Sequence, residues 1–157
     1  MAKRRKRTNS MVPAKGVLRD MADKLWSIAI RSDWNWRCAV CGRTPCEAHH
    51  MIPREKFRTR YDLRNGIALC ATHHRFCPNT SPHNSGFGFS LWLKENHPER
   101  EAWVEMKLSC KRELDFDGTK NEAYYISVIE SLREYVEPDE FERVCGVKFS
   151  RYLEANR

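Results

Sequence analysis

The residues able to hold a metal ion or move a proton are concentrated between positions 38 and 74 of this 157-residue chain. Two residues separate Cys38 from Cys41, and two separate Cys70 from His73. A tight turn with this spacing aims two ligand atoms at one ion, and three thiolates with one imidazole form a closed tetrahedral zinc site. The sequence therefore predicts a structural zinc ion (Zn) held by these four residues.

The seven cysteines include two further candidates for the zinc site. Cysteines at this pairwise spacing, in an odd total number, indicate metal binding rather than disulfides in a reducing compartment. Cys46 or Cys77 could supply the fourth zinc ligand, which would release His73 for other work. The spacing alone leaves that choice open.

Four more polar residues lie in the same segment: His49, His50, Asn65 and His74. Adjacent residues of a strand point to opposite faces, so His49 and His50 are expected to do different work. His74 follows a zinc ligand at the start of a predicted helix and should point away from the zinc. If one zinc joins both ligand pairs, His50, Asn65 and His74 approach one another. Hydrogen-bonded core residues are the alternative interpretation.

His83 lies further along, in a stretch at residues 78–88 that is rich in Pro, Asn, Ser and Gly and predicts a loop. A solvated loop histidine is the simple interpretation. An additional metal ligand is the alternative.

The pattern His50-Met-Ile-Pro53, followed by Asn65-x4-Cys70-x2-His73-His74, resembles the HNH (ββα-metal) endonucleases, in which zinc knuckles are common. The similar stretch runs from about residue 25 to 76. The resemblance implies DNA as substrate, His50 as the general base, and Asn65 as the residue that holds the loop or the metal. It further implies that His49 and His74 bind a catalytic divalent ion.

Two positions differ from many members of that family. This chain has His73 where many have Cys, and His49 where many have Asp. A neutral ligand at position 49 favours transition metals such as Mn or Ni at the catalytic site without excluding Mg. Residues 82–99 also loosely resemble phage recombination proteins of the NinG type. This resemblance implies a bacterial or phage-encoded protein that nicks DNA or acts on branched recombination intermediates.

The charge is unevenly distributed along the chain. Residues 1–60 carry 15 Lys and Arg against 5 Asp and Glu (+10), and residues 61–157 carry 13 against 16 (−3), which together give +7. A basic half indicates a polyanionic partner. Basic residues alternate with Phe57 and Tyr61 in an expected loop at residues 54–64, which predicts a nucleic-acid contact through Arg54, Lys56, Arg58, Arg60 and Arg64. A solvated loop is the alternative.

Several helices and two short strands are expected to position these residues. Apolar residues at helical spacing predict a helix over residues 17–32, and short apolar runs predict strands at 48–52 and 67–69 before a helix at 71–76. Helices are also expected at residues 89–96 and 99–112, from a capping box at Thr119 and Glu122 onward, and from Pro138, with Gly146 ending the last of these before another short helix. The expected fold class is α+β, mostly α: a ββα-metal core on a structural zinc, with an N-terminal helix and a C-terminal helical extension.

We therefore expect a disordered basic arm (residues 1–15), a nuclease core (16–88) and a helical extension (89–157). No apolar run reaches the roughly 20 residues that span a bilayer, and no secretory signal is evident, so the expected location is cytoplasmic. The leading hypothesis is a metal-dependent DNA endonuclease. The alternative is a non-catalytic, zinc-stabilised DNA-binding module, and the oligomeric state stays open, a homodimer included.

Overall fold

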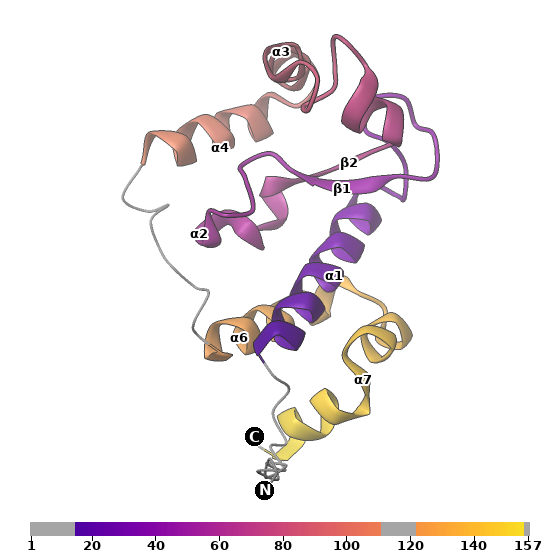
Figure 1. The fold of residues 1–157 in the computed structure, drawn as a ribbon, viewed down its shortest axis with the longest axis vertical. Coiled ribbons are helices and arrows are strands. Elements are labelled where there is room, and N and C mark those ends of the chain that lie inside the picture. Colours follow the sequence, from indigo (N-terminus) through magenta and orange to yellow (C-terminus); the bar gives the residue numbers. More distant parts are fainter. Residues whose placement is uncertain (1–14, 111–121, 156–157) are drawn as a thin grey trace, which may run out of the picture.

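The computed structural model describes residues 15–110 and 122–155. The predictions for the basic arm before Lys15 and for the capping residue Thr119 lie outside these ranges. Within them, the elements form one two-stranded sheet surrounded by helices (Figure 1). This confirms the α+β, mostly helical class.

Helix α1 (Lys15–Asp33) lies at the centre of the molecule (Figure 1). Its apolar residues recur every three or four positions, which places them on the buried side of the helix. The helix contacts the sheet on one side and helices α6 (Glu122–Leu132) and α7 (Pro138–Ala155) on the other. The buried side chains of α1 include Leu18, Ala22, Leu25, Trp26, Ala29 and Ile30.

Strand β1 (Glu47–His50) pairs antiparallel with β2 (Gly66–Leu69), and His50 stands opposite Gly66. Strand β1 ends two residues before the predicted limit of 52. A short π-helical turn, η2 (Thr72–Phe76), follows β2 in place of a regular helix. Gly66 lies directly under α1, because a Cβ atom there would overlap the side chain of Ile30.

The connection between the strands is more structured than the predicted loop. It contains the single-turn helix α2 (Phe57–Arg60) and the 3₁₀ turn η1 (Leu63–Asn65). The Asp62 carboxylate caps η1 by accepting from the Arg64 backbone N–H at 2.9 Å. Such capping satisfies a backbone donor locally and lets a turn form without any apolar periodicity.

The helical extension packs in two separate places. Helix α3 (Gly86–Asn96) begins three residues before the predicted start, since Ser85 caps it, and it packs against α4 (Pro98–Ser109) next to the sheet. Helix α6, the turn η3 (Arg133–Tyr135) and α7 pack on α1 instead (Figure 1). Gly146 interrupts α7 with a φ of 68°, so the predicted break is confirmed.

The apolar interior forms two clusters. The larger joins α1, α6 and α7, and the smaller joins β2, α3 and two of the cysteines, Cys38 and Cys70. Trp34 packs against both clusters. Among the described helices, none has the length and apolar character that a membrane-spanning helix needs.

Candidate active site

The four predicted zinc ligands converge on one point. The Cys41 and Cys70 sulfurs are 3.8 Å apart, and His73 Nδ1 lies 3.3 Å from Cys70 Sγ and 3.6 Å from Cys38 Sγ. A tetrahedral ion with Zn–S near 2.3 Å and Zn–N near 2.0 Å places two sulfurs about 3.8 Å apart, and a sulfur and a nitrogen about 3.5 Å apart. The cluster therefore has the ligand types and spacing for zinc.

The two alternative zinc ligands lie outside this cluster. Cys46 is buried beside it, and the Cys77 thiol accepts a hydrogen bond from Thr80 Oγ1 at 3.0 Å. His73 thus belongs with the cysteines, and its neighbour His74 points to a different group of residues.

That second group consists of three histidines. His74 Nε2 lies 3.0 Å from His49 Nδ1 and 3.2 Å from His83 Nε2. An ion with metal–nitrogen bonds near 2.1 Å holds neighbouring nitrogens about 3.0–3.4 Å apart. The site thus joins the two ligands implied by the resemblance, His49 and His74, with the loop histidine His83. In the sequence, metal binding by His83 was only the alternative interpretation, because His83 lies nine positions beyond His74 in a polar loop.

Glu47 orients His74, a role the sequence analysis missed. The Glu47 carboxylate accepts from His74 Nδ1 at 2.7 Å and from Arg75 Nη2 at 2.7 Å. Because a carboxylate only accepts, His74 carries its proton on Nδ1 and turns a lone pair on Nε2 toward His49 and His83. Glu47 and His49 lie two positions apart on β1, so strand alternation was the signal that places both on one face.

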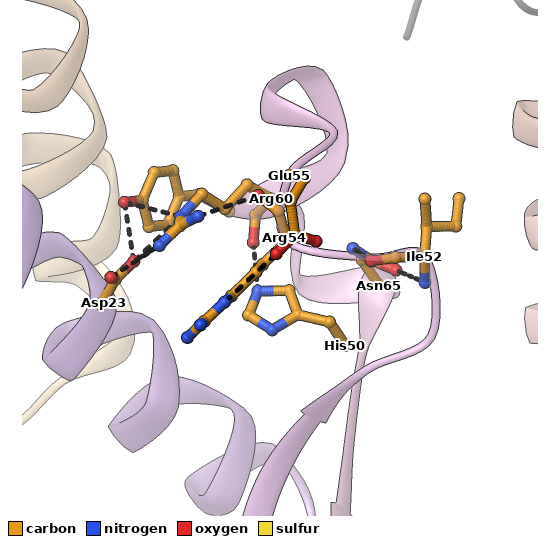
Figure 2. Close-up of polar contacts among 8 residues, drawn as sticks. Asp23, His50, Ile52, Arg54, Glu55, Arg60 and Asn65 are labelled. Carbon is orange, nitrogen blue, oxygen red and sulfur yellow. Dashed lines mark hydrogen bonds and ion pairs between the residues drawn. The ribbon is translucent and has the colours of Figure 1, made fainter. Parts of the chain in front are cut away.

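His50 points to the other side of β1, as strand alternation predicts. Its Nε2 lies 2.9 Å from the Arg60 carbonyl oxygen, which only accepts, so the proton of the neutral ring sits on Nε2 (Figure 2). The ring stacks on Trp26 of α1, with centroids 3.7 Å apart and planes 10° apart. The remaining nitrogen, Nδ1, is therefore the one that can accept a proton.

Burial keeps both adjacent histidines neutral. Desolvation lowers the pKa of His50 to about 4, although the hydrogen bond to the Arg60 carbonyl acts to raise this pKa. Desolvation, aided by His74 and His83, lowers the pKa of His49 to about 3. Neutral imidazoles are the form needed both to bind a metal and to accept a proton.

Asn65 holds the loop between the strands. It is fully buried, and its Oδ1 accepts from Ile52 N at 2.6 Å (Figure 2). Its Nδ2 donates to the carbonyls of Ile52 and Thr59, each at 3.0 Å. Of the two roles implied by the resemblance, this geometry supports the loop and not the metal. The grouping of Asn65 with His50 and His74 as catalytic residues stays a prediction.

A cleft of about 360 Å³ lies between the end of strand β1 and helices α3 and α4. His49, His50 and His83 line one wall, and α3 and α4 line the other with apolar side chains and the carboxylates of Glu101 and Glu105. The cleft is thus bordered by His50 and by two members of the three-histidine group, although the side chains of His49 and His50 leave β1 on opposite sides.

The basic residues predicted to contact nucleic acid differ in exposure. The side chains of Arg54 and Arg64 are 68% and 64% exposed, Arg58 is exposed and Lys56 is half-buried. Arg60 corrects the prediction, because its side chain is only 9% exposed and forms an ion pair with Asp23 at 2.7 Å. A buried, paired guanidinium is not available to a phosphate.

These features together have the arrangement of a ββα-metal site. They are the cysteine and histidine cluster that could hold zinc, the strand pair, the turn that follows it and the three-histidine group. Residues 38–76, or 39 of the 157, match a family model described as HNH endonuclease. This central segment is similar to the HNH endonucleases, as its sequence pattern implied. Neither the curated proteins nor the solved structures gave a significant match.

Proposed function

We propose that this protein is a metal-dependent endonuclease that hydrolyses DNA phosphodiester bonds. One observation carries the proposal: a neutral His50, with its proton on Nε2, lines the same cleft as His49 and His83, two of the three histidines whose ring nitrogens converge. The family match supports DNA as the substrate. The finer part of the proposal is that the enzyme nicks duplex DNA or acts on branched recombination intermediates.

His50 acts as the general base in this proposal. Its Nδ1 accepts a proton from the attacking water while the new bond to phosphorus forms, and the bond from phosphorus to the leaving oxygen breaks. The leaving oxygen then gains a proton from solvent. Because Nε2 already donates to the Arg60 carbonyl, Nδ1 is available without a change of tautomer.

The three-histidine group fits a divalent ion. His49, His74 and His83 would hold it through neutral nitrogens, and when bound it stabilises negative charge on the phosphate and on the leaving oxygen. A donor set of imidazoles alone suits transition metals such as Mn better than Mg, which prefers oxygen ligands.

Exposed basic residues next to the base support binding of the phosphate backbone. Arg54 and Arg58 follow strand β1, and Arg64 lies on the turn that leads into β2. Contacts of this kind position the duplex without reading its sequence.

The test compares His50→Ala and His74→Ala while a divalent metal is titrated into cleavage reactions. The substrates are supercoiled plasmid, single-stranded DNA and a four-way junction. His50→Ala should lose about 10²–10⁴-fold in rate at every metal concentration, since added metal replaces no proton acceptor. His74→Ala should regain activity as the metal concentration rises.

His97→Ala serves as the matched control, because His97 packs against Trp34 and Trp92 away from the cleft. It should cleave at the wild-type rate. If added metal restores cleavage by His50→Ala but not by His74→Ala, the two assigned roles are reversed. Wild-type rates in both site variants would favour the non-catalytic DNA-binding module.

A further inference from the structure

The carbonyl that holds His50 belongs to Arg60, and the Arg60 side chain is itself held from α1. The guanidinium donates from Nε and Nη2 to Asp23 Oδ1 at 3.0 and 2.9 Å, and from Nη2 to Asp23 Oδ2 at 2.7 Å. The Tyr61 hydroxyl also donates to Asp23 Oδ1, at 2.8 Å. Asp23 therefore grips two consecutive residues, one of which carries the carbonyl that contacts the base.

Arg60 also closes the loop on which it lies. Its Nη1 donates to the Arg54 carbonyl at 2.9 Å, so one side chain links both ends of the segment from Arg54 to Arg60 (Figure 2). The guanidinium is 9% exposed, so it exchanges few of these contacts for water. Without the ion pair to Asp23 on α1, fewer contacts would hold the Arg60 carbonyl in its observed direction.

The same helix supplies the surface on which the His50 ring lies. Trp26 is one turn beyond Asp23 on α1; it stacks on His50 and donates from Nε1 to the Asp62 carbonyl at 3.3 Å. Helix α1 thus contacts both the ring and the loop that bonds its Nε2. This helix lies outside the segment that matches the HNH family.

We propose that Asp23 is a positioning residue for the general base: through Arg60 it fixes the backbone carbonyl that sets the orientation of the His50 ring. The inference rests on the function proposed above, in which His50 takes a proton from water. General-base catalysis depends on the placement of the accepting atom, and an error of 1 Å can cost about 100-fold in rate.

The test is a double-mutant cycle in cleavage rate between Asp23→Asn and His50→Ala. Asparagine keeps the size of the side chain but turns an amide toward the guanidinium, where two donors face each other. We expect kcat to fall by about 10- to 100-fold in Asp23→Asn at unchanged KM. In the His50→Ala background, the same change should have no further effect, because residues that act as one unit are non-additive.

Asp33→Asn is the matched control. It removes another ion pair between α1 and a distant arginine, since Asp33 accepts from Arg100 Nη2 at 2.9 Å. It should leave kcat unchanged in both backgrounds. Asp23→Glu keeps the charge and should cleave faster than Asp23→Asn. This second variant still tests the role of Asp23 if Asp23→Asn does not fold.

Nitrogen-15 NMR of the histidine rings reports the tautomer of His50, which a general loss of stability does not change. Wild type and Asp33→Asn should show the His50 proton on Nε2 alone, and Asp23→Asn should show a mixture of tautomers. Equal losses from Asp23→Asn in the wild-type and His50→Ala backgrounds, or an unchanged tautomer, would overturn the positioning role. If His50→Ala cleaves like wild type, the proposed function itself fails, and this inference fails with it.

Discussion

At the scale of single residues, the site depends on hydrogen bonds that decide where each imidazole carries its proton. Glu47 fixes the tautomer of His74 and Arg60 fixes that of His50, so the two rings present bare nitrogens to different partners. A carboxylate behind a ligating histidine also raises the basicity of the ligand and holds the ring in place. Adjacent histidines on one strand can therefore serve as metal ligand and base without competing.

Removal of the Glu47 carboxylate should weaken the second metal site. We expect Glu47→Ala to lower the affinity for Mn²⁺ by about 10- to 100-fold, with a smaller loss for Glu47→Gln, because His74 is then free to rotate and change tautomer. Calorimetric titration of Mn²⁺ into the zinc-loaded protein measures this. The control is Glu55→Gln, whose exposed carboxylate pairs with Arg54 outside the histidine group. Identical affinities in all four proteins would exclude a role for Glu47.

At the scale of elements, the close contact between α1 and β2 brings the helix to His50, the proposed general base. Gly66 pairs with His50 across the sheet and leaves room for Ile30 and Trp26 of α1. The Trp26 ring can stack on His50 only because the strand opposite carries no side chain at this point. A single glycine thus allows the close approach of helix α1 to the strand pair.

Gly66→Ala should therefore destabilise the protein by roughly 1–3 kcal/mol, as expected for an added methyl group in a packed interior. Chemical denaturation in urea measures the change in the free energy of unfolding. Gly16→Ala is the control, since a Cβ atom at Gly16 of α1 meets open space and helix propensity favours alanine by up to about 1 kcal/mol. A Gly66→Ala protein as stable as wild type would show that α1 can shift at no cost.

At the scale of the whole molecule, two apolar clusters depend on different supports. The larger cluster is built by long helices that pack on each other, while the smaller one includes Cys38 and Cys70, two of the four residues placed to hold a zinc ion. Structural zinc contributes about 10–16 kcal/mol of apparent binding free energy in small domains, as much as the whole stability of most domains. The strand pair therefore should not survive loss of the metal.

Cys41→Ala should lose the bound zinc and unfold the smaller cluster. Elemental analysis measures the zinc, and hydrogen exchange should show lost protection in β1, β2 and η2 before α1 and α6. Cys77→Ala is the control and should keep one zinc per chain, because its sulfur lies outside the cluster. A folded Cys41→Ala protein with full zinc content would contradict this assignment.

The sequence by itself determined the features that depend on spacing of a few residues. The two ligand pairs, the opposite directions of His49 and His50, and the central helix all follow from turn, strand and helix periods. These are local properties, because backbone geometry alone sets which side chains share a turn or a face.

Only the tertiary structure decided which distant residues complete the site. His83 joins His49 and His74 through a loop, and Asp23 meets Arg60 across 37 positions. Arg60 was expected at the surface because nothing near it in the sequence shows the carboxylate that allows its burial. Such contacts arise when α1 packs across the strands, and the free energy that selects this packing comes from burial of apolar surface distributed over the whole chain. The local spacing of residues in the sequence does not predict this packing.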